Sequence, residues 1–233
     1  QAVGATPHLV GVTSFCDVPG VAVVGDFNPR PEAVMAQEPD VVLMAGYESQ
    51  SSVAGSLTAL GLDVKMLPLV TLADMRASTR EVGAIVDRQA AASAVITAFD
   101  GALGAVVEPA KKPKVLLVYD VQPGFVITTG GGDHLSELVA ACGGVNAISG
   151  PVTARIGLER VLEAAPDLIL HVAPDQRFAD SAAALKHWSA WASLPAVATG
   201  NVVVYPDDGL ARNGPHLAAV VPRLAAFIAA AAR

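Results

Sequence analysis

The chain has 233 residues, 52% of them hydrophobic and 16% charged, and its net charge at pH 7 is −7. This length accommodates one large domain or two small ones, and no apolar run reaches the roughly 18 residues of a membrane-spanning helix, which indicates a soluble protein. The acidic balance argues against nucleic acid or an anionic membrane surface as the main ligand, since each requires a basic face on the protein.

Strand and helix patterns alternate through the first third of the chain. Pro31 suits the first turn of a helix, and Pro39 ends that helix. Residues 40–46 then carry apolar side chains on both faces, as buried strands of parallel sheets do. The pattern predicts an α/β lobe with a parallel sheet, built from strands over 8–14, 21–25, 40–46 and 62–69 and helices over 31–38 and 52–61.

A long helical pattern follows this lobe. Residues 71–107 contain no proline and no turn cluster, and their apolar residues recur at three- and four-residue steps. The pattern predicts one long amphipathic helix or two nearly continuous ones. Even about 25 helical residues would span nearly 40 Å, which is longer than a crossover helix in a small sheet requires.

The last part of the chain repeats the order of the first. It predicts strands and helices in alternation, with strands over 115–120 and 201–206, helices over 136–144 and 183–195, a helix-then-strand segment over 159–170 and a closing helix entered through Pro215. We therefore expect two α/β lobes joined by one long helix, with an N-terminal lobe over 1–70, the helix over 71–108 and a C-terminal lobe over 109–233. The alternative is a single doubly wound sheet of six or seven strands.

A short motif occurs once in each lobe. Residues 32–43 and 159–170 both contain Glu, then Val two residues later, then Pro-Asp before an aliphatic strand. The Pro-Asp half predicts a helix that stops and a strand that starts. A Glu in the first turn of a helix is stabilised by the helix dipole, so capping is one interpretation of Glu32 and Glu159.

The two cysteines, Cys16 and Cys142, are too few for a disulfide framework and form no C-x-x-C pair. We expect two small buried thiols rather than a bridge. For an enzyme, the sequence offers little: it has no G-x-S-x-G elbow, and Cys16 has no evident His partner. An α/β hydrolase with a cleft site is therefore the least favoured alternative.

Several segments, in order and at matching spacing, resemble the substrate-binding proteins of ATP-driven importers for vitamin B12, ferric siderophores and heme. The resemblance is greatest to the vitamin B12-binding branch and runs from residue 9 to the end of the chain. The segments that carry it are "LVGVTSFCDVP" (9–19), "GDFNPRPEAVMAQEPDVVL" (25–43), "LVAACGGVNAISG" (138–150), "GLERVLEAAPDLIL" (157–170) and "RNGPHL" (212–217).

The resemblance implies two Rossmann-like lobes joined by one long α-helix, with a ligand cleft between them and no catalytic activity. It implies a transported corrinoid, with heme or a ferric siderophore as the alternative, and no resident cofactor or metal. It gives Glu32 and Glu159 a second interpretation, as contacts to the membrane permease, one per lobe. It also implies a monomer outside the cytoplasm, after removal of a signal peptide and with or without a lipid anchor, and places the family's first strand upstream of Gln1.

The ligand-binding residues should lie in loops at the carboxyl ends of strands, where open α/β sheets bind ligands. The arginines among them suit an anionic or carbonyl-rich ligand, although surface arginines are the plainer interpretation. Tyr47 and His134 offer axial groups for a metal chelate, and helix capping is the alternative role for His134. The full set of expected ligand-binding residues is Phe15, Cys16, Asp17, Asp26, Phe27, Arg30, Tyr47, Phe125, His134, Arg155, Asp208 and Arg212.

Overall fold

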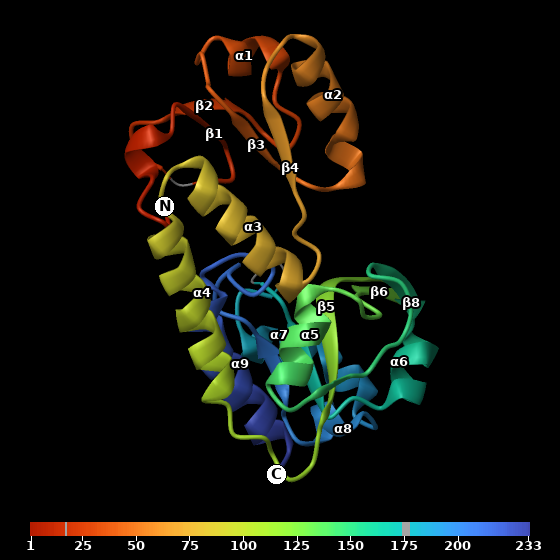
Figure 1. Cartoon of the computed structure of the whole chain (residues 1–233). Helices are drawn as coiled ribbons and strands as arrows, with labels where there is room; N and C mark the ends of the chain where they lie inside the picture. The colour runs from red at the N-terminus through yellow and green to blue at the C-terminus, as the bar shows by residue number, and fades with distance from the viewer. Residues whose placement is uncertain (17, 174–177) are drawn as a thin grey trace. The chain divides into compact units, whose positions relative to one another are not determined.

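Figure 1 shows the computed structural model, which describes residues 1–16, 18–173 and 178–233. The chain forms two compact units, of which unit 1 comprises residues 1–69 and 73–96, and unit 2 comprises residues 70–72 and 97–233. Within the described ranges, no helix combines the length and the apolar character needed to cross a lipid bilayer.

Unit 1 alternates strands and helices in the predicted order. Its elements are η1 (Thr6–His8), β1 (Gly11–Thr13), β2 (Ala22–Gly25), α1 (Pro31–Met35), β3 (Val42–Ala45), η2 (Glu48–Gln50), α2 (Ser51–Ala59) and β4 (Val64–Leu67). Strand β1 pairs with β2 and β3 pairs with β4, both in parallel. The parallel pairing agrees with the sequence pattern, but the four strands form two separate two-stranded sheets rather than one.

Helices α1 and α2 supply the core of unit 1. Val34 of α1, Leu57 of α2 and Met44 of β3 are buried together, with Val42, Val64 and other apolar side chains packed around them. Since side chains alternate between the faces of a strand, Val42 and Met44 face α1 and α2, and Leu43 faces the opposite side.

The single long helix that was expected after the N-terminal lobe is interrupted. It forms α3 (Leu72–Ile85) and α4 (Gln89–Gly104), the second of the two alternatives that the periodicity allowed. Helix α3 from Ala73 onward and the start of α4, up to Ile96, belong to unit 1. Asp87 adopts a left-handed conformation with φ +52°, and the Arg88 amide donates to the Gly83 carbonyl oxygen at 2.7 Å. The sequence did not locate the break, because an Asp residue, rather than Gly or Pro, takes the left-handed position.

Unit 2 contains a six-stranded sheet and five α-helices beyond α4 among the described residues. Its elements are β5 (Lys114–Gln122), β6 (Phe125–Thr128), α5 (His134–Ala141), β7 (Val145–Asn146), β8 (Ala154–Gly157), α6 (Leu158–Ala164), β9 (Leu168–His171), α7 (Ser181–Trp188), η3 (Ser189–Trp191), α8 (Pro195–Ala198), β10 (Val202–Val204) and α9 (Leu217–Ala231).

The sheet of unit 2 is mixed. Its order is β10-β9-β5-β6-β8, and β7 also pairs with β5. Strands β9, β10 and β7 run in parallel to their neighbours, whereas β6 is antiparallel to both β5 and β8. The hairpin from β5 to β6 was not predicted, although Pro123 and Gly124, whose φ is +85°, form its turn.

The fully buried Trp188 belongs to the core of unit 2, in one apolar cluster with side chains of β5 and β9. The Trp188 indole N–H donates to Nε2 of the buried His171 at 3.1 Å. Of the two cysteines, Cys142 is buried as expected, but Cys16 is exposed, and both thiols are free.

The repeated motif has the same local structure in both units. Glu38 and Ala165, each directly before the proline of the motif, take the left-handed conformation with φ +47° and +46°. Val34 and Val161 are both buried at the core-facing position of the preceding helix. The two copies therefore encode one helix–turn–strand unit, which leads from α1 to β3 and from α6 to β9.

Candidate functional site

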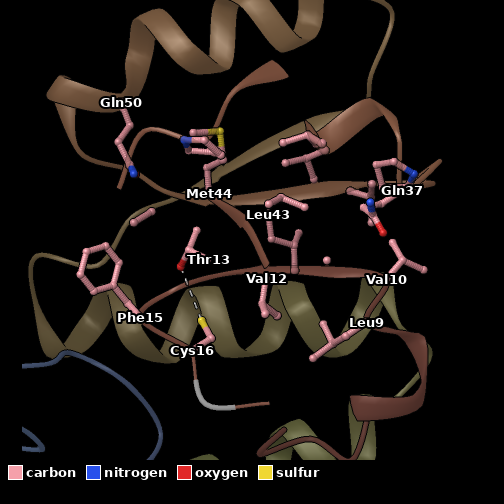
Figure 2. Close-up of a pocket in the computed structure, with 18 of the residues that line it drawn as sticks. Leu9, Val10, Val12, Thr13, Phe15, Cys16, Gln37, Leu43, Met44 and Gln50 are labelled. Carbon is pink, nitrogen blue, oxygen red and sulfur yellow. Dashed lines mark hydrogen bonds between the residues drawn. The ribbon is translucent and has the colours of Figure 1, made fainter. Parts of the chain in front are cut away.

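Unit 1 contains a cavity of about 430 Å³ between β1 and β3. Figure 2 shows the two strands running side by side across it, with Phe15 and Gln50 at one end and Leu9 and Gln37 at the other. The end with Phe15 and Gln50 is the carboxyl end of both strands. Most of the lining is apolar, as in small-molecule sites generally.

Aromatic side chains collect at the carboxyl end of this cavity. Phe15 and Phe27 line it, and the Phe27 ring stacks on Tyr47 with centroids 6.3 Å apart and planes inclined by 23°. Phe27 is 40% exposed and Tyr47 42% exposed, so both rings present surface to an incoming molecule. The Gln50 side-chain amide donates to the Phe27 carbonyl oxygen at 2.8 Å and fixes the loop that carries this ring.

The polar residues expected at this end have local roles. Asp26 accepts the Asn28 amide at 3.1 Å, which closes an Asx-type turn, and Arg30 is the exposed residue directly before α1. Cys16 lines the cavity with its thiol 3.8 Å from the Thr13 hydroxyl. Asp17, also expected here, lies outside the described residues.

Unit 2 brings together two pairs of the expected residues. The Arg155 guanidinium lies over the Phe125 ring, 3.5 Å from its centroid, because β8 and β6 are neighbours. Asp208 and Arg212 form an exposed ion pair with each other. Each guanidinium is therefore already oriented by a neighbour, and this limits the freedom it loses on contacting an anionic ligand.

His134 occupies a different setting from the other expected residues. It is only 8% exposed, and its Nε2 lies 3.4 Å from the Leu210 carbonyl oxygen. Burial lowers its pKa, partly offset by the nearby Asp133 carboxylate. Among the described residues, no three His, Cys, Asp or Glu side chains are grouped as metal ligands. We therefore leave His134 out of the proposed ligand site.

Glu32 and Glu159 occupy equivalent positions. Each is exposed and is the second residue of its helix, in the first turn of α1 and of α6. Neither helix has a side-chain hydrogen bond at its N-cap residue, Arg30 or Gly157. The geometry is therefore compatible with both a stabilising carboxylate and an accessible contact point.

Two features of the site were not predicted. Gln50 was overlooked, although it is a polar residue only three positions beyond Tyr47 in a loop already expected to bind ligand. The apolar lining contributed by Val12 and Leu43 was also missed, because both residues were expected inside a continuous sheet.

Solved structures with similar folds are known. The heme-binding protein HutB of Vibrio cholerae superposes with a TM-score of 0.85 and 18% identity, over 97% of this chain and 92% of that one. The vitamin B12-binding protein BtuF of Vibrio cholerae gives 0.77 and 21%, over 99% and 91%. A heme-binding protein of Pseudomonas aeruginosa gives 0.77 and 22%, over 100% and 88%. No curated protein sequence matches the chain.

The family model described as "Periplasmic binding protein" matches residues 1–208. Its members are periplasmic substrate-binding proteins that work with the membrane permease of an ABC importer, and they carry transported ligands rather than cofactors. They are not enzymes, which removes the hydrolase alternative. The match covers most of the chain and agrees with its two α/β units, so this chain belongs to the periplasmic binding protein family.

Proposed function

We propose that the protein captures a planar metal–tetrapyrrole for import, with a corrinoid such as cobalamin as the first candidate. The stacked Phe27 and Tyr47 rings at the carboxyl end of the cavity support this proposal most directly. Flat, half-exposed aromatic rings offer a large contact area to a flat macrocycle at small entropic cost. From unit 2, we propose Phe125, Arg155, Asp208 and Arg212 as ligand contacts, because guanidinium groups suit carboxylate or amide substituents.

Heme is the second candidate, and Tyr47 favours it. Tyrosine oxygen serves as an axial iron ligand in some heme proteins. The Tyr47 ring is half-exposed beside the cavity, so its hydroxyl is available to an iron centre. A ferric siderophore is the third candidate, since the arginines of unit 2 suit its anionic oxygen atoms.

Titration of the purified protein with cyanocobalamin, hemin and a ferric hydroxamate separates the candidates. Absorbance and calorimetry should detect one saturable ligand at a 1:1 ratio. For a corrinoid, Phe27→Ala should raise the Kd about tenfold through lost ring contact, while Tyr47→Phe should leave it unchanged. For heme, Tyr47→Phe should alter the Soret band. Tyr119→Phe, on β5 outside the proposed set, is the control. Failure of both cyanocobalamin and hemin to bind would refute the proposal, and saturable binding of the ferric hydroxamate alone would favour the third candidate.

We further propose Glu32 and Glu159 as the contacts to the permease. Both carboxylates are exposed, one in each unit, at matched positions of the repeated motif. Opposite charges across a docking interface chiefly set the rate and the orientation of encounter. Two separated carboxylates can orient the protein on a partner that presents arginines.

Charge reversal tests this docking role. The double variant Glu32→Arg with Glu159→Arg should strongly reduce ligand uptake by cells or proteoliposomes but leave ligand affinity unchanged. Glu81→Arg, an exposed carboxylate on α3, is the matched control and should import normally. Normal uptake by the double variant would assign the two glutamates to helix stabilisation alone.

A further inference from the structure

The carboxyl end of β5 and its neighbours β6 and β8 carry a row of outward-facing side chains in unit 2. The register places Asp120 opposite Ile127, and Ile127 opposite Arg155. Directly paired residues of antiparallel strands point to the same face of a sheet, so these three side chains share one face. Gln122 and Phe125 form the next row on that face, because they are paired with each other and lie two residues farther along their strands. We call these five side chains the outer face.

The other side of the same strands packs into the core. Val121 and Val126 are buried in the apolar cluster that contains Trp188, and Ile156 packs against this cluster. By contrast, all five side chains of the outer face are half-buried or exposed. They lie at the carboxyl end of β5, which is where open α/β sheets bind ligands. The outer face is therefore a surface on which cargo can lie.

The outer face presents charges of both signs. The Gln122 side-chain amide donates to one oxygen of Asp120, Oδ2, at 2.5 Å, while the Arg155 guanidinium lies over the Phe125 ring. Asp120 and Arg155 stand two strands apart, which places their backbones about 10 Å from each other. The ion pairs found among the described residues of unit 2 do not include Asp120. Its second oxygen, Oδ1, is therefore an acceptor that remains for a donor on the cargo.

A second acceptor without a partner belongs to unit 1. Gln50 is only 8% exposed and lines the cavity, and Figure 2 shows its side chain at the same end as Phe15. Its Nε2 donates to the Phe27 carbonyl oxygen at 2.8 Å. Because a carbonyl oxygen only accepts, this bond fixes which end of the amide faces Phe27. The other end, Oε1, is shielded from water and has no hydrogen-bond partner within the described ranges.

The burial of Gln50 Oε1 without a hydrogen bond costs free energy that water does not offset here. The last side-chain torsion of glutamine is broad, so a small turn presents Oε1 to a group in the cavity. An N–H or O–H donor on the cargo would remove the cost. An ionised carboxylate would not, because it only accepts hydrogen bonds.

We infer that Asp120 and Gln50 are specificity-determining residues, each of which requires an N–H or O–H donor on the cargo. This inference rests on the proposed function. A corrinoid such as cobalamin carries primary carboxamides, whose N–H groups donate and whose oxygen atoms suit Arg155 on the same outer face. Heme carries propionates, which are ionised at neutral pH and only accept. The two acceptors therefore favour a carboxamide-bearing macrocycle, and the Asp120 carboxylate also repels propionates.

The Kd values of cyanocobalamin and hemin test both residues. Asp120→Asn keeps the shape and removes the charge, so the Kd of cyanocobalamin should rise about tenfold and that of hemin should fall at least threefold. Gln50→Met replaces the amide by an apolar chain of similar length. It should raise the Kd of cyanocobalamin about fivefold and change that of hemin less than about twofold. Glu163→Gln, an exposed carboxylate on α6 outside the proposed set, is the control and should change neither value.

Cyanocobalamin with one carboxamide hydrolysed to a carboxylate supplies the matched change on the ligand. At least one such derivative should bind the unmodified protein at least about tenfold more weakly than cyanocobalamin does. In Asp120→Asn this difference should shrink to less than about threefold, because a double-mutant cycle isolates the contact between the two groups. A purely structural role of Asp120 would leave the difference unchanged.

The outcomes separate this inference from the proposed function. Equal changes of the two Kd values in Asp120→Asn, or an undiminished difference for every hydrolysed derivative, would overturn the role of Asp120 and leave the proposed function intact. Equal changes in Gln50→Met would reduce Gln50 to a support of the Phe27 loop. Binding of hemin alone would overturn the inference and retain the heme candidate. Failure of both ligands to bind would refute the proposed function and this inference with it.

Discussion

Replacement of Asp167 by alanine should destabilise unit 2 measurably. The Asp167 side chain is 17% exposed, and its two oxygens accept the Lys114 amide at 2.8 Å and the Lys111 ammonium at 3.1 Å. The first contact ties the end of α6 to the start of β5, the strand at the centre of the sheet. The variant removes both contacts and leaves the Lys114 amide to water.

The expected loss is about 2 kcal/mol. A hydrogen bond to a charged acceptor contributes about 1.5 to 3 kcal/mol, and the lower end applies because the Lys114 amide lies near solvent. The Lys111 ammonium is 66% exposed, so its ion pair adds at most about 1 kcal/mol. For a chain of this size, a loss of about 2 kcal/mol corresponds to a Tm lower by about 4 to 8 °C.

Tryptophan fluorescence during urea unfolding is a suitable assay, because both tryptophans, Trp188 and Trp191, lie in unit 2. Glu163→Ala is the control, since it removes only the exposed ion pair with Arg160 and should cost less than about 0.5 kcal/mol. Equal losses in the two variants would refute the assigned role of Asp167.

Three further predictions concern single residues. Burial lowers the pKa of His134 in the folded state, so the unfolded state binds the proton more readily. The free energy of unfolding should therefore fall as the pH drops below about 6.5. Urea titrations at pH 5 and pH 7 should show that the His134→Gln variant lacks this part of the pH dependence. A thiol reagent at pH 8 should modify only the exposed thiol of Cys16 in the native protein, because burial raises the pKa of Cys142 to about 11. Reaction of both thiols before unfolding would contradict this prediction. Gly143 has φ +86°, and an added Cβ would lie 2.3 Å from Cδ of Pro109. The Gly143→Ala variant should therefore lower the Tm of unit 2 by several degrees. An unchanged melting curve would contradict this packing.

Local signals in the sequence predicted most of the elements. Proline before β3 and β9, and the periodicity of α2 and α9, placed helices and strands close to their observed positions. The break between α3 and α4 was not located because Asp87, rather than Gly or Pro, takes the left-handed position that ends α3. The exposure of Cys16 also depended on tertiary structure, since a thiol next to a strand is usually buried.

The candidate site was predicted only in part. Placing ligand residues in loops after strands brought Phe15, Phe27 and Tyr47 into consideration, and two of these rings stack in the structure. His134 was included by the same reasoning, but its side chain turns into unit 2 toward the Leu210 carbonyl group. The direction of a side chain depends on packing against distant segments, which loop position does not encode.

The sequence by itself determined the repeated helix–turn–strand unit, because proline, the residue before it and the buried valine act within a few residues of one another. Only the tertiary structure decided how each copy is used. Among the described residues, strand β9 lies between two partners and β3 pairs with one. Asp167 holds a neighbouring strand, whereas Asp40 is exposed. Strand pairing joins backbone groups far apart in the chain, so two segments that share one motif acquire different neighbours.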